Sequence, residues 1–215
     1  MHKALWMAVL FTASGLLSTT ASAQQAKAFT GMRLFNSYCY LCHGTQGKGD
    51  GPLAGRMEQK PQSLANADVV RLSDRDIFRV IQGTAPHGKA ENMPEFGRAI
   101  PEPDIDALVT YVRFIQKAEH PLMGDPEVGK AVYERYCVVC HGENGKGKGP
   151  MTSVLPIHPA DHTNAKEMNR MNNTQLINYI ARGGTGKSYM PGWEGVLTRE
   201  EMEGVASFIR LLSYR

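Results

Sequence analysis

The chain has 215 residues, with 24 Lys and Arg against 21 Asp and Glu and a formal net charge of +3. This near balance, without a block of like charges, excludes the strongly basic surface that nucleic-acid binding requires. A hydrophobic content of 42%, together with 22 glycines and 12 prolines, is typical of a soluble, loop-rich protein. The same composition excludes a membrane-spanning bundle and a disordered chain.

The first 23 residues are predicted to form a secretory signal peptide. A short start with Lys3 precedes the apolar stretch 4–17, and the Ala-Ser-Ala sequence at 21–23 fits a cleavage site. The apolar stretch is shorter than the roughly 20 residues that span a bilayer, which argues against a permanent anchor. We therefore expect cleavage after Ala23, export to the periplasm and a mature chain that begins at Gln24.

Three amphipathic helices are predicted between residues 24 and 117. The first ends at Cys39, and the middle one opens with a capping pattern in which Asp76 follows Ser73 by three residues. Strand-like alternation is absent from the sequence, so the predicted fold class is all-α. The helix faces, which follow the spacing of a helical stripe, are Gly31, Leu34, Phe35 and Tyr38, then Ile77, Val80 and Ile81, then Ile105, Leu108, Val109 and Val112.

The second half of the chain repeats the first. An offset of 98 residues aligns the cysteine motifs, and the offset slips by one or two residues in later loops, as expected of a tandem duplication. We therefore expect two domains, 24–120 and 121–215, with a linker over 117–127. The matching faces are Gly129, Val132, Tyr133 and Tyr136, then Leu176, Tyr179 and Ile180, then Met202, Val205, Ala206 and Ile209, and Thr198 with Glu201 forms a capping box.

All four cysteines belong to two C-x-x-C-H motifs. This pattern is the signature of covalent haem attachment through the thiols, with the adjacent histidine on the iron. A thioredoxin-like redox pair would need a βαβ context, and a zinc site would need a second pair of ligands. The sequence offers neither. It thus predicts two covalently bound haem c groups, held by Cys39, Cys42 and His43 and by Cys137, Cys140 and His141.

The second axial ligand of each iron is predicted to be a methionine. Met93 and Met190 occupy matching places in the two halves, and each is followed by proline and, two residues later, by an aromatic residue. His87, His158 and His162 are alternative ligands, but none has a counterpart in the other half. The expected metal ligands are therefore one histidine and one methionine in each domain.

These motifs resemble those of class I c-type cytochromes, and their tandem arrangement resembles the two-haem periplasmic cytochrome c4 type. The resemblance covers essentially the whole chain after the signal peptide. It implies two domains, each a few helices wrapped around one haem. It also implies a close crossing of the first and last helices, at Gly31 with Tyr111 and at Gly129 with Phe208.

The resemblance further implies that a backbone carbonyl near a downstream proline holds the proximal histidine. Pro52 and Pro150 occupy matching positions for that role. A hydrogen bond of this kind would fix the orientation of the imidazole and raise its basicity.

The predicted function is electron transfer rather than catalysis. We expect a periplasmic dihaem carrier that passes electrons from a quinol-oxidising complex or dehydrogenase to a terminal oxidase or reductase, docking on membrane complexes from outside. Ligation by histidine and methionine raises the reduction potential, which suits such delivery. The alternative is a dihaem oxidoreductase, or its electron-accepting subunit, acting on a small substrate. Catalysis would require an open axial position, and a methionine candidate in both halves argues against one.

Overall fold

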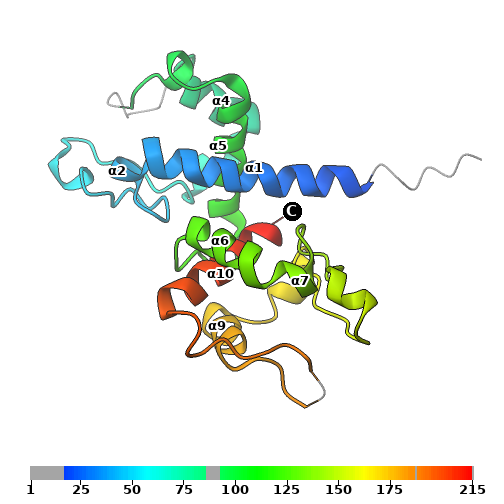
Figure 1. Ribbon diagram of the computed structural model, residues 1–215. Coiled ribbons are helices and arrows are strands. Elements are labelled where there is room, and N and C mark those ends of the chain that lie inside the picture. Colours follow the sequence, from blue (N-terminus) through cyan, green and yellow to red (C-terminus); the bar gives the residue numbers. More distant parts are fainter. Residues whose placement is uncertain (1–16, 86–92, 187, 215) are drawn as a thin grey trace, which may run out of the picture.

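The described part of the computed structural model, residues 17–85, 93–186 and 188–214, is helical (Figure 1). Within these ranges the strand-like pairing is limited to an isolated bridge between Glu194 and Leu197, so the all-α prediction is confirmed. The main helices of the two halves are α1 (Leu17–Tyr38), α4 (Asp74–Gln82) and α5 (Glu102–Lys117), then α6 (Pro126–Tyr136), α9 (Asn173–Arg182) and α10 (Arg199–Leu212). Short turns between them are α2 (Tyr40–His43), η1 (Ala54–Arg56), α3 (Ala67–Arg71), η2 (Phe96–Arg98), α7 (Val138–His141), η3 (Pro150–Ser153) and α8 (Ala165–Met168).

The N-terminal helix α1 begins before the predicted cleavage point. Because it starts at Leu17, the bond after Ala23 falls within the helix, and residues 1–16 of the predicted signal peptide lie outside the described residues. Among the helices that the structure describes, none combines the length and the apolar character needed to cross a membrane.

The first and last helices of each half cross at a glycine, as expected. A Cβ atom on Gly31 would lie 2.0 Å from the carbonyl oxygen of Ala107 and 2.9 Å from the Cβ of Tyr111. On Gly129 it would lie 1.9 Å from the carbonyl oxygen of Gly204. In both halves the nearest atom belongs to the backbone one turn before the expected partner, Ala107 before Tyr111 and Gly204 before Phe208. The pairing of Gly129 with Phe208 itself stays a prediction.

The predicted helix starts are confirmed by reciprocal capping. Ser73 accepts from the backbone N–H of Asp76 while Asp76 accepts from that of Ser73, and Thr198 and Glu201 do the same. Each pair satisfies backbone donors that the first turn of a helix leaves free.

The predicted inward face of α9 is wrong at one position. Tyr179 is 41% exposed, whereas Ile177 is 2% exposed and joins Leu176 and Ile180 in the core. On a helix wheel Ile177 and Tyr179 flank the line through Leu176 and Ile180 on opposite sides, so only one of them can share the buried stripe. The aliphatic side chain takes that place, because the phenol keeps its hydroxyl in water.

The predicted linker has no helix between the end of α5 and the start of α6, and it is tied to α10. The backbone N–H groups of Met123 and Gly124 both donate to the Ser207 hydroxyl, each at 3.0 Å. The hydroxyl of a buried serine thus fixes the path of the chain from one half to the other.

The two halves touch through side chains of both cores. Phe29 of α1 packs against both buried clusters, and its ring centroid lies 5.9 Å from that of Phe208. Leu211, near the end of α10, is buried in the cluster of the first half, and Tyr214 packs its ring on Phe114 at 5.3 Å. The helices of the first half occupy the upper part of Figure 1 and those of the second half the lower part.

A buried arginine ties the last helix of the second half to the loop before α9. Arg210, which is 3% exposed, donates to the carbonyl oxygens of Met168 and Met171, both at 2.6 Å, and to the side-chain oxygen of Asn173 at 3.0 Å. Arg113 makes the corresponding contact in the first half, where it donates to the Leu72 carbonyl.

Replacing Arg210 with leucine is expected to lower the free energy of unfolding by about 2–4 kcal/mol, because two buried carbonyls lose a charged donor. Arg199→Leu is the matched control on the same helix. Arg199 is exposed, and its ion-pair partner among the described residues is Glu203, so its loss should cost less than about 1 kcal/mol. Chemical denaturation of the two holoprotein variants measures the difference, and equal losses would contradict the role of Arg210.

Candidate functional site

Each C-x-x-C-H motif forms a single helical turn directly after the first helix of its half. The backbone N–H of Cys42 donates to the carbonyl of Cys39 at 3.2 Å, and that of His43 donates to the same carbonyl at 2.9 Å. In the second half, the N–H groups of Cys140 and His141 donate to the carbonyl of Cys137 at 3.1 and 2.9 Å. Residues spaced i, i+3 and i+4 share one face of a helix, so each turn presents two sulfurs and an imidazole together.

The cysteines are free thiols that do not form disulfides. Burial, and secondly the charge of the neighbouring Cys42, raise the pKa of Cys39 to about 12. Burial and then Cys140 raise the pKa of Cys137 to about 12 in the same way. These thiols are therefore protonated at neutral pH. Across the described ranges, no three His, Cys, Asp or Glu side chains gather into a metal-binding cluster.

The proximal imidazole of the second half is oriented by a backbone carbonyl. Nδ1 of His141 donates to the carbonyl oxygen of Ala160 at 3.2 Å, which leaves Nε2 for a metal. Burial lowers the pKa of His141, and the bond to Ala160 opposes that shift. The expectation that Pro150 marks the acceptor is wrong. Pro150 begins the short turn η3, whereas the acceptor follows Pro159 in a loop that folds back over the motif.

The corresponding imidazole of the first half is half-buried, and its Nδ1 atom is buried and unsatisfied. Nδ1 of His43 has no hydrogen-bond partner among the described residues, and burial lowers the pKa of the ring. The loop that would supply the acceptor has the same backbone register in both halves. The N–H of Leu64 donates to the Gly47 carbonyl, and the N–H of His162 donates to the Gly145 carbonyl, both at 2.7 Å. By this register Gln62 matches Ala160. Pro52 precedes η1, and because Nδ1 of His43 has no acceptor among the described residues, the role expected of Pro52 stays a prediction.

The donor set fits a covalently bound haem. A porphyrin with two vinyl groups requires two thiols and one neutral imidazole on the same face of a turn, and both motifs provide them. The pKa values of the two imidazoles are lowered by burial, which favours the neutral form that binds iron, and within the described part of the chain the Nδ1 of His43 is unsatisfied.

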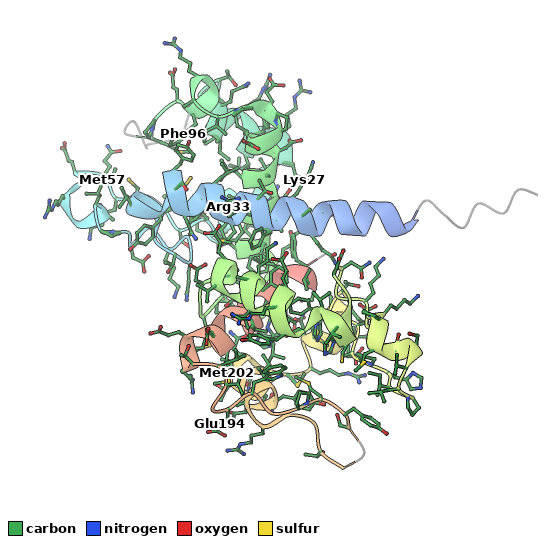
Figure 2. All side chains as sticks on the ribbon, viewed as in Figure 1. Lys27, Arg33, Met57, Phe96, Glu194 and Met202 are labelled. Carbon is green, nitrogen blue, oxygen red and sulfur yellow. The ribbon has the colours of Figure 1, made fainter. Side chains whose placement is uncertain are left out.

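The two methionine segments are anchored beside the end of the first helix in each half. Met93 is half-buried against the first core, and the ring of Phe96 packs on Tyr38 with centroids 6.1 Å apart. Met190 is half-buried against the second core, and the ring of Trp193 packs on Tyr136 at 5.2 Å. Figure 2 shows Phe96 next to the end of α1 that leads into the motif. The aromatic residue after each methionine thus holds its segment close to the cysteine turn.

A backbone bond also fixes the position of Met190. The N–H of Gly184 donates to the Met190 carbonyl at 3.0 Å, and the N–H of Trp193 donates to the Ile180 carbonyl at 3.2 Å. The loop of 183–193 is therefore closed on the end of α9, with Met190 at its base.

The alternative histidine ligands have different surroundings. His87 lies outside the described residues, and His158 is exposed. His162 is buried and stacks on His141, with ring centroids 4.1 Å apart and planes at 18°. A ring stacked on the proximal imidazole is beside that ligand rather than on the opposite side of the metal. Sequence reasoning missed this contact, although the absence of a counterpart for His162 in the first half was a signal that it has a special place.

Two tandem all-α domains, each with a C-x-x-C-H turn and a methionine segment beside it, define a class I c-type cytochrome. The family model described as cytochrome c oxidase, cbb3-type, subunit III matches the chain twice, over residues 26–112 and 124–209, and the chain belongs to this family. It is a dihaem electron-transfer protein, since the family implies covalently bound haem c and the two domains fit two haems.

Curated relatives of the chain are oxidase subunits and a small cytochrome. The cbb3-type cytochrome c oxidase subunit CcoP of Rubrivivax gelatinosus is 28% identical over 195 residues, covering 90% of this chain and 57% of that protein. Subunit FixP of Bradyrhizobium sp. (strain ORS 278) is 26% identical over 199 residues, covering 85% and 60%. Cytochrome c6 of Chlorolobion braunii is 30% identical over 86 residues, covering 40% and 88%. The chain thus spans less than two thirds of the length of the two oxidase subunits.

Proposed function

We propose that this chain is a periplasmic electron carrier that transfers electrons between respiratory partners, exported with cleavage after Ala23 and divided into domains 24–120 and 121–215. The observation that carries the proposal is the repeated one-turn motif, in which two thiols and an imidazole with a lowered pKa share one face. A site of this kind holds a haem permanently, as a carrier requires.

Each domain would hold its haem with its own residues. The two thiols would form thioether bonds to the porphyrin, the histidine would bind the iron through Nε2, and the methionine would bind from the other side. The bound group supplies a one-electron couple between ferric and ferrous iron. The proposed ligands are Cys39, Cys42, His43 and Met93 in the first domain and Cys137, Cys140, His141 and Met190 in the second.

The surrounding chain keeps such a site closed to substrates. The Ala160 carbonyl holds the imidazole of His141 in one orientation, and the closed loop of 183–193 keeps Met190 close to the motif. With a histidine and a methionine as its two protein ligands, the metal would have no position left for a substrate, which supports electron transfer over catalysis.

The partners would be a quinol-oxidising complex or dehydrogenase as donor and a terminal oxidase or reductase as acceptor. The relatives named as subunits of cbb3-type oxidases favour a terminal oxidase as acceptor. They also favour a second candidate function, in which the chain is an electron-accepting subunit of such a complex. Recovery of the tagged protein from cells separates the two: a free carrier purifies alone, and a subunit purifies with its catalytic partner.

A spectroelectrochemical titration of the purified holoprotein is expected to show two reversible one-electron steps, with the methionine-to-iron charge-transfer band present in the ferric form. Met93→Leu and Met190→Leu should each remove about half of the band and lower one of the two potentials, because methionine ligation raises the potential. Met123→Leu is the control, since Met123 is exposed in the linker. A band that survives in both axial variants would contradict the assigned ligands.

A further inference from the structure

The two haem sites differ behind the proximal histidine. In the second half, Nδ1 of His162 lies 3.0 Å from the hydroxyl of Tyr133, while the His162 ring stacks on His141. Tyr133 is 1% exposed and His162 is 7% exposed, so this hydrogen-bonded pair is sealed from water. The Tyr133 ring centroid lies 6.5 Å from that of His141, which places both members of the pair around the ligand.

The same two places in the first half are apolar. Phe35 matches Tyr133, with its ring centroid 6.3 Å from that of His43 against 6.5 Å in the second half. Leu64 matches His162, because both donate their backbone N–H to the corresponding glycine carbonyl at 2.7 Å. A Cβ on Gly47 would meet Leu64 and one on Gly145 would meet His162, which confirms the correspondence of the two side chains. At these two places the halves share backbone and ring positions and differ in polarity. The neighbouring ring reverses the order, since Phe35 packs on Tyr111 and Tyr133 packs on Phe208.

This difference acts on the charge of the iron centre. A ferric haem carries one more positive charge than a ferrous one, and a polar, polarisable shell stabilises the charged state more than an apolar shell does. The electron-rich face of the His162 ring lies against the imidazole that shares the charge of ferric iron, a contact that resembles a cation–π interaction. Phe35 and Leu64 offer the first site no hydrogen-bonded polar pair. Both effects favour the ferric state of the second site.

We infer that the Tyr133–His162 pair lowers the reduction potential of the C-terminal haem, so that the two haems are inequivalent. This inference rests on the proposed haem ligation. The pair acts as a positioning and tuning element, because neither side chain is a ligand of the iron. Because the pair lowers the potential of the C-terminal haem, transfer of an electron from this haem to the N-terminal haem becomes more favourable.

The test is a redox titration of full-length holoprotein variants that exchange the pair between the domains. His162→Leu with Tyr133→Phe gives the second site the side chains of the first. It should favour reduction of the second haem three- to tenfold in the equilibrium constant of reduction. This corresponds to a reduction potential raised by about 30–60 mV for a one-electron couple. Leu64→His with Phe35→Tyr should lower the other potential by a similar amount. His158→Leu is the control, since His158 is exposed, and it should move neither potential.

Each outcome of the exchange decides the inference. If both exchanges leave the potentials where they are, or move them in the opposite directions, the inference is wrong. If the second-site variant loses its haem, the reverse exchange in the first site decides alone. Tyr133→Phe keeps the stacked ring and removes the hydrogen bond, so a shift smaller than that of the double variant is expected. A wild-type protein without two methionine-ligated haems would instead contradict the proposed function, and the absorption spectrum reports this before any titration.

Discussion

Replacing Gly129 with alanine is expected to lower the free energy of unfolding by about 3 kcal/mol or more and to reduce the haem content of the C-terminal domain. The added Cβ would lie 1.9 Å from the carbonyl oxygen of Gly204 and 2.1 Å from its carbon, and both are backbone atoms. Because backbone atoms cannot rotate away, α6 and α10 would separate and the core between them would open. Thermal unfolding followed by circular dichroism measures the loss.

The same substitution in an open place is the control. A Cβ on Gly55 would find nothing within 4 Å, so Gly55→Ala should change stability by less than about 0.5 kcal/mol. Gly31→Ala should repeat the large effect in the first domain, since its Cβ would lie 2.0 Å from the Ala107 oxygen. If Gly129→Ala were as stable as Gly55→Ala, the helices would not be in contact at this glycine.

Removing both thiols of one motif is expected to halve the covalent haem content of the protein. Cys137→Ser with Cys140→Ser should leave a protein that carries the mass of a single haem after denaturation, because thioether bonds alone survive unfolding. Without the haem, whose porphyrin would fill part of the core, the second domain has too small a core to be stable. This domain should therefore also become protease-sensitive. Mass spectrometry of the denatured protein gives the haem count directly.

The matched variant is the same pair of changes at Cys39 and Cys42. It should also leave one haem, and the combination of all four changes should leave none. A motif whose loss leaves the haem count at two would not be an attachment site. Loss of both haems from either pair alone would mean that the two sites do not form independently.

Local patterns predicted the helices and the tandem halves well, because they depend on residues close in sequence. The capping pairs Ser73 with Asp76 and Thr198 with Glu201 lie within one turn, so their side-chain chemistry is sufficient. The helix crossings at Gly31 and Gly129 were expected from the resemblance to class I c-type cytochromes, and not from a local pattern. The sequence does not record which turn of the last helix comes nearest, and in both halves that turn is the one before the expected partner.

The acceptor of the proximal imidazole could not be predicted from residue types. Any residue supplies a backbone carbonyl, so Ala160 carries no sign of its role, and Pro150 was the wrong marker in the second half. The sequence indicated only that Tyr133 and His162 differ from their counterparts in the first half. That they touch depends on how a long loop folds back over the motif, which no local pattern encodes. The assignment of Met93 and Met190 remains a prediction.

The exchange of side chains between the two cores changes what the duplication means. Leu211, near the chain's end, is buried in the first half's cluster, and Phe29 of the first half packs against both clusters. Neither copy can complete its core alone, because cutting the chain in the linker would expose apolar surface on both pieces. The two repeats are therefore no longer independent folding units. Deleting either repeat would remove core contacts of the remaining one and destabilise it, so we expect the duplication to be retained.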